Sequence, residues 1–105
     1  MRNKLRYSIG ERSLFKIDLP SIVIIGSEYC PACEDLKELM EEELESGKAK
    51  FFDINSTMGK VFVKWANIQY IPFIIILDFD NEKIYEAEVK DVGEEFELVI
   101  KNELG

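Results

Sequence analysis

The sequence contains no histidine and only two cysteines among its 105 residues. No imidazole can therefore act as a general base or bind a metal in this chain. Basic residues are also scarce, with 13 lysines and arginines against 21 aspartates and glutamates. The resulting net charge of −8 argues against binding to nucleic acids or to anionic membranes, because both would repel the protein.

Long hydrophobic runs are missing as well. The longest apolar stretch, residues 71–77, contains Pro72 and is far too short to span a bilayer. Residues 1–13 are charged and polar, so we expect no signal peptide and a cytoplasmic location. The single glutamine and the abundance of Ile, Glu and Lys are typical of a protein from a thermophile, and an AT-rich genome gives much the same composition. Length and composition predict one globular domain over residues 1–105.

The two cysteines, Cys30 and Cys33, have the spacing C-x-x-C between an apolar run and a helical pattern. A cysteine at the start of a helix faces free backbone N–H groups and the positive end of the helix dipole. Both stabilise a thiolate, the form that attacks disulfides. Pro31 suits the first turn of a helix, where its missing N–H costs nothing. The motif therefore predicts a dithiol redox centre.

Hydrophobic patterns predict strands that alternate with helices, and hence an α/β protein. The run at 21–26 is continuously apolar, which is typical of a central strand buried on both faces. We expect the segment at 83–89 to be an edge strand and the chain from residue 94 onward to be a helix. The remaining predicted elements are strands at 5–9, 49–54 and 73–77, helices at 31–46 and 58–67, and a helical turn at 13–18.

This order of elements, with C-x-x-C after a buried strand and Ile71-Pro72 ahead of another, resembles the thioredoxin superfamily over residues 21–105. The resemblance implies a thioredoxin-like fold, a single domain with a central mixed β-sheet flanked by helices. It implies that Cys30 is the nucleophile and that Cys33, buried beneath it, is the resolving thiol. It also implies a cis peptide bond before Pro72. The two thiols would then form a redox-active disulfide.

The resemblance further implies a groove that binds substrate beside the cysteines. Ile71 and Pro72 would border this groove, and Val92-Gly93 resembles the family's Val-Gly turn ahead of the last helix. Tyr29 takes the place of the tryptophan that precedes the nucleophile in thioredoxins.

The implied activity is that of a thiol–disulfide oxidoreductase that reduces or exchanges protein disulfides. Such an enzyme needs no cofactor and no metal, and we expect it to act as a monomer. Its electrons would come from a thioredoxin-reductase-like flavoprotein or from glutathione. Carboxylates at Glu28, Glu34 and Asp35 disfavour a thiolate, so we expect a reductant or a moderate exchanger rather than a strong oxidant.

The sequence also departs from the family pattern. Ile24 stands where thioredoxins carry a buried aspartate, and the Pro-Ala pair between the cysteines is closer to glutaredoxins. Three alternatives stay open. The cysteines could form an inert structural disulfide, the domain could be a non-enzymatic thioredoxin-like module that binds partners, or two subunits could share a metal or Fe–S cluster as some glutaredoxin-like proteins do.

Overall fold

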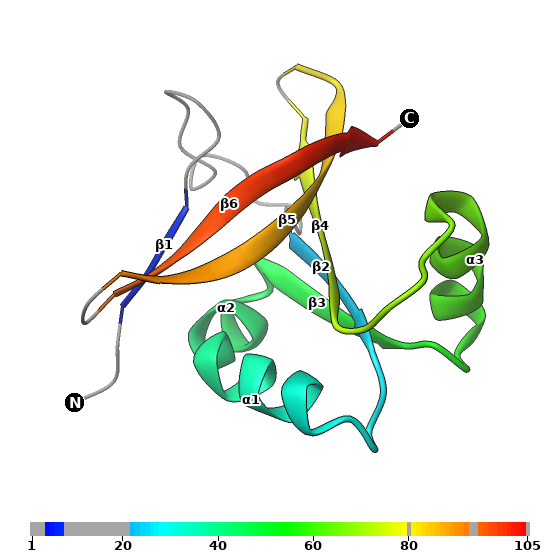
Figure 1. Ribbon diagram of the computed structural model, residues 1–105, viewed down its shortest axis with the longest axis horizontal. Helices are drawn as coiled ribbons and strands as arrows, with labels where there is room; N and C mark the ends of the chain where they lie inside the picture. Colours follow the sequence, from blue (N-terminus) through cyan, green and yellow to red (C-terminus); the bar gives the residue numbers. More distant parts are fainter. Residues whose placement is uncertain (1–3, 8–21, 80, 93–94, 105) are drawn as a thin grey trace.

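The computed structural model describes residues 4–7, 22–79, 81–92 and 95–104 (Figure 1). In this part of the chain six strands form one mixed sheet in the order β1-β6-β5-β4-β2-β3. The helical turn predicted at 13–18 and the ends of the first two predicted strands, residues 8, 9 and 21, lie outside the described residues. The elements are β1 (Lys4–Tyr7), β2 (Ile22–Gly26), α1 (Pro31–Leu39), α2 (Glu41–Ser46), β3 (Ala49–Asp53), α3 (Thr57–Ala66), β4 (Phe73–Asp78), β5 (Lys83–Val92) and β6 (Glu95–Leu104).

Strand β2 is buried on both faces, as its sequence predicted. Ile22 and Ile24 belong to the apolar cluster on the side of α1 and α2, while Val23 and Ile25 belong to the cluster on the side of α3. Its neighbours are β3, which runs parallel to it, and β4, which runs antiparallel. Because side chains alternate along a strand, this one element supplies both halves of the core.

The helix predicted at 31–46 is divided into α1 and α2 at Met40. This residue leaves helical geometry, with φ −103° and ψ 23°, and its side chain is fully buried. Its N–H still donates to the carbonyl oxygen of Leu36, and its own carbonyl oxygen accepts from Leu44, both at 2.9 Å. The interruption is therefore a bend at one residue. Gly47 ends α2 in the left-handed region, with φ 86°, as predicted.

The Ser56 hydroxyl caps α3 by accepting a hydrogen bond from the N–H of Gly59 at 3.0 Å. The spacing of apolar residues predicts a contact face for this helix made of Met58, Val61, Phe62, Trp65 and Ala66. This prediction is partly wrong, because the contact face is centred on Phe62, Val63 and Ala66. Three apolar side chains of the helix are instead about half exposed, namely Met58, Val61 and Trp65.

The C-terminal helix predicted from residue 94 is wrong, because this segment is strand β6. Its sequence fits the periodicity of a helix and also that of a strand, because Glu95, Glu97 and other polar residues alternate with apolar ones. As a helix, this segment would have Phe96, Val99, Ile100 and Leu104 on its apolar side. Leu98 is not among them, yet it is fully buried. Strand β6 pairs antiparallel with β5, so β5 lies inside the sheet and is not the predicted edge strand.

This replacement changes how the sheet is covered. Within the described residues, α1 and α2 pack on one face of the sheet and α3 packs on the other (Figure 1). Strand β1 pairs parallel with β6 at the far edge, and the strand order differs from that of thioredoxin. The chain is thus an α/β domain with a mixed sheet. None of the helices described is long and apolar enough to cross a membrane.

Candidate redox site

Cys30 is the N-cap residue of α1, at the point where the loop after β2 enters the helix. Its sulfur accepts a hydrogen bond from the backbone N–H of Cys33 at 3.2 Å, and its carbonyl oxygen accepts one from Glu34 at 3.1 Å. Pro31 occupies the first helical position. Cys30 is partly exposed. It lies at the start of the helix, where free N–H groups and the helix dipole favour negative charge.

Cys33 lies one turn into α1 and is fully buried. Burial raises the pKa of its thiol from 9.0 to about 11, and a hydrogen bond with the Cys30 side chain acts in the same direction. The backbone of Ser27 and the charge of Lys37 lower it in part. Both cysteines are free thiols. The first cysteine is partly exposed and the second is buried, as expected for Cys33.

Two residues that shape the site were missed by sequence reasoning. Gly26, the last residue of β2, lies so close to Cys33 that a Cβ placed on it would be 2.7 Å from Sγ. A glycine at the end of an apolar strand can mark such a close approach, so a signal was present. Lys37 is one turn beyond Cys33, and its charge lowers the pKa of that thiol in part. Its ammonium group lies over the ring of Phe51, 4.0 Å from the ring centroid.

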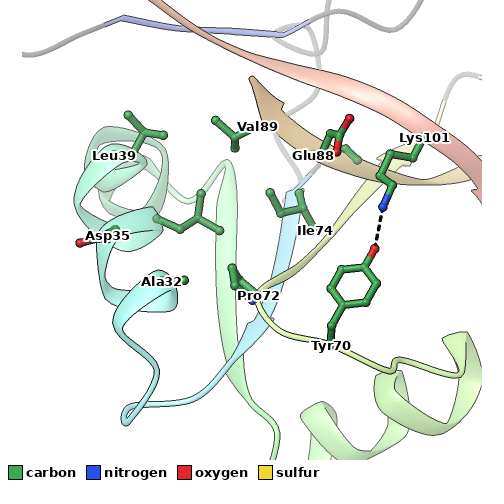
Figure 2. A pocket seen from close by; sticks show the side chains of 11 residues that line it. Ala32, Asp35, Leu39, Tyr70, Pro72, Ile74, Glu88, Val89 and Lys101 are labelled. Atoms are coloured by element: carbon green, nitrogen blue, oxygen red, sulfur yellow. Dashed lines mark hydrogen bonds between the residues drawn. The ribbon is translucent and has the colours of Figure 1, made fainter. Parts of the chain in front are cut away.

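The peptide bond between Ile71 and Pro72 is cis, as predicted. Pro72 lines a pocket of about 420 Å³ (Figure 2). The same pocket is lined by Ala32, which lies between Pro31 and Cys33. The structure therefore brings the proline that precedes β4 to the first turn of α1. Ile71 lines a different pocket, on the side of α3.

The structure describes the other predicted groove residues only in part. The Tyr29 side chain is 91% exposed, and its backbone N–H donates to the Ser27 hydroxyl at 3.2 Å. Val92 ends β5, and the next element is a strand rather than the expected helix because the C-terminal segment pairs with β5. Gly93 lies outside the described residues.

A polar network, also missed by sequence reasoning, holds the segment ahead of Pro72 against the β5–β6 hairpin. The Tyr70 hydroxyl donates to the carboxylate of Glu86 and accepts from Lys101 Nζ at 2.9 Å. Asn102 donates to the same carboxylate at 3.1 Å, and Lys101 lies 3.3 Å from it. Burial alone would raise the pKa of Glu86, but the bonds from Tyr70, Asn102 and Lys101 hold it below 4.5.

The described residues contain no group of three or more Cys, Asp or Glu side chains that could hold a metal ion. No family model, curated protein or solved structure matches this chain.

Proposed function

We propose that the protein is a thiol–disulfide oxidoreductase that reduces or exchanges protein disulfides through Cys30 and Cys33. One observation carries the proposal, namely the hydrogen bond from the Cys33 N–H to the Cys30 sulfur at the start of α1. The amide and the positive end of the helix stabilise negative charge on that sulfur. Cys33 lies three residues further along the chain, is fully buried, and carries the second thiol that the exchange uses.

The chemistry proceeds in two exchanges. The Cys30 thiolate attacks one sulfur of a substrate disulfide, the substrate S–S bond breaks, and the departing substrate thiolate takes up a proton. Cys33 then loses its proton to solvent and attacks the Cys30 sulfur of the mixed disulfide. The second substrate thiol leaves, and a Cys30–Cys33 disulfide remains. The substrate has gained two electrons and the protein has lost two.

Return to the dithiol requires an external donor of two electrons. A thioredoxin-reductase-like flavoprotein or glutathione would supply them, and the two can be compared by following the return of both thiols. The raised pKa of Cys33 bears on this cycle, since a buried neutral thiol does not compete with Cys30 for substrate at neutral pH.

We also propose that the central part of the molecule is thioredoxin-like. The cis bond before Pro72 and the placement of α1 and α3 on opposite faces of β2 and β4 support this relation. The strand β6 in place of a terminal helix is a departure from it.

The test is to trap the intermediate in single-cysteine variants. We expect Cys33→Ser to accumulate a mixed disulfide with insulin whose own disulfides are intact, detectable by mass spectrometry. We expect Cys30→Ser to form none. Because Cys33→Ser leaves the nucleophile in place, it is the matched control for Cys30→Ser. Trapping on Cys33 alone would reverse the assigned roles. Trapping on neither would leave the partner-binding module as the better account.

A further inference from the structure

The pocket beside Pro72 lies between α1 and the sheet and reaches across β4 to β5 and β6 (Figure 2). Its volume of about 420 Å³ is within the range of about 300–1,000 Å³ that is typical of ligand pockets. Most of the lining is apolar and comes from Ala32, Leu36, Leu39, Pro72, Ile74, Ala87 and Val89.

The pocket exists because this part of the sheet is not covered by a helix in the described residues. The predicted C-terminal helix is β6, which lies in the plane of the sheet and extends it. Helix α1 covers the sheet only up to Leu36 and Leu39, and beyond them the side chains of Ala87 and Val89 face the pocket. An apolar side chain that entered here would lose contact with water on several sides.

The polar groups at the pocket favour a basic occupant. Lys101 is already engaged, because it lies 3.3 Å from Glu86 and donates to Tyr70 at 2.9 Å. Asp35 on α1 and Glu88 on β5 lie on opposite sides of the pocket, and Figure 2 shows the Asp35 carboxylate pointing away from the cavity. Among the described residues Glu88 has one distant ion pair, 3.9 Å from Lys90, and exposed pairs of this kind contribute little. Among the described residues the surroundings of the pocket therefore carry excess negative charge, as does the whole chain.

We propose that this pocket selects the substrate, and that it binds a bulky apolar side chain near the disulfide of a basic polypeptide. This inference rests on the proposed function, since the substrate is held through Cys30 while its neighbouring residues reach the pocket. Ala32 connects the two places, because it lies two residues from the nucleophile and lines the pocket.

A polypeptide fits better than a small disulfide. Small ligands are oriented by polar groups that converge on them. Here the Tyr70 hydroxyl and the Lys101 ammonium bond to each other and to Glu86, so they are not free to orient a ligand. A polypeptide attached at Cys30 needs no such groups, because its own backbone positions the side chain.

The first experiment compares two short cyclic disulfide peptides, one with Leu and Lys beside the cysteines and one with Ser and Glu. We expect a kcat/KM at least about tenfold higher for the first, the effect of burying one aliphatic side chain. Asp35→Lys should lower this ratio severalfold, and Leu39→Gln should do the same. Glu38→Lys is the matched control, because it makes the same change of charge on α1 outside the pocket and should leave the ratio unchanged.

A second experiment separates this inference from the proposed function, because it needs no redox chemistry. The chain has four alanines, of which Ala32 and Ala87 line the pocket while Ala49 and Ala66 do not. With ¹³C-methyl alanine, the Leu–Lys peptide with both cysteines replaced by alanine should shift the Ala32 and Ala87 signals and leave Ala66 in place.

Each result supports or overturns one claim. Methyl shifts without reduction of either peptide would overturn the proposed function and keep the pocket as a binding site. Reduction of both peptides at equal rates, or methyl shifts absent from Ala32 and Ala87, would overturn the pocket's role. Faster reaction with hydroxyethyl disulfide than with the Leu–Lys peptide, unaffected by Leu39→Gln, would also overturn it and would favour small disulfides.

Discussion

Cys33 packs directly against Gly26, so closely that position 26 has no room for a side chain. A Cβ there would be 2.7 Å from Cys33 Sγ and 2.9 Å from Phe51 Cε2. The end of β2 thus fixes the depth at which the second cysteine lies in the core. This relationship links the strand that organises the sheet to the chemistry at its end.

Gly26→Ala should therefore destabilise the reduced protein by about 1–3 kcal/mol, the range for overpacking in a core. We also expect slower release of a mixed disulfide, because the clash displaces Cys33. Urea unfolding and the decay of a Cys30 mixed disulfide measure the two effects.

Gly47→Ala is the control for this substitution. Gly47 has a φ of 86° but open space around it, so alanine there should cost about 1 kcal/mol without altering exchange. If Gly26→Ala changed stability and exchange no more than Gly47→Ala does, the packing of Gly26 against Cys33 would not matter.

The raised pKa of Cys33 predicts a dependence of stability on pH. The folded protein holds the thiol neutral up to about pH 11, whereas the unfolded chain ionises near 9.0. Unfolding thus releases a proton in this window, so the stabilisation is complete below pH 9 and is lost as the pH rises toward 11. Two pKa units correspond to about 3 kcal/mol.

Unfolding of the reduced protein and of Cys33→Ala at pH 8 and at pH 10.5 measures this effect. The difference in stability between the two should shrink by about 2 kcal/mol at the higher pH. Taking the difference removes the titration of lysines and tyrosines that the two proteins share. A difference that stayed constant with pH would show that Cys33 is not protected from ionisation.

Glu86 predicts the opposite dependence on pH. Its pKa is held below 4.5, so its contribution to stability is present above that pH and is lost as the pH falls through the lower folded value. Glu86→Gln should cost about 1–3 kcal/mol at neutral pH, because it removes a buried charge bound by Tyr70, Asn102 and Lys101. It should also flatten the loss of stability below pH 4.5.

Glu103→Gln is the matched control. Its carboxylate pairs with Lys83 at 2.7 Å, but both side chains are about half exposed, and such pairs contribute about 1 kcal/mol or less. Equal effects of the two substitutions on urea unfolding would show that the network around Glu86 has no special weight.

The sequence predicted those parts of the fold whose pattern allowed one interpretation. The continuous apolar run of β2, the C-x-x-C motif at a helix start and Ile71-Pro72 ahead of β4 were all placed correctly. The last segment was not, since its residues fit a helix and a strand equally well. Its pairing with β5 decides the outcome, and that contact is not visible in local periodicity.

The same limit applies to the site. Cys30 and Cys33 are three residues apart along the chain, so spacing alone brings them together. The network of Tyr70, Glu86 and Lys101 joins residues that are 16 and 31 positions apart. The pocket depends on that long-range pairing too, because it opens where the expected helix is replaced by a strand. Such features follow from the sheet order and not from a motif.

The most direct test of the central claim is the redox equilibrium of the Cys30–Cys33 pair. The protein is equilibrated in a dithiothreitol or glutathione series, thiols are alkylated, and the oxidised fraction is read by mass spectrometry. We predict one reversible two-electron couple that vanishes in either single-cysteine variant, near about −270 mV for a thioredoxin-like reductant or about −200 to −230 mV for a glutaredoxin-like exchanger. Thiols that never pair, or a disulfide that resists every reductant in the series, would contradict the account.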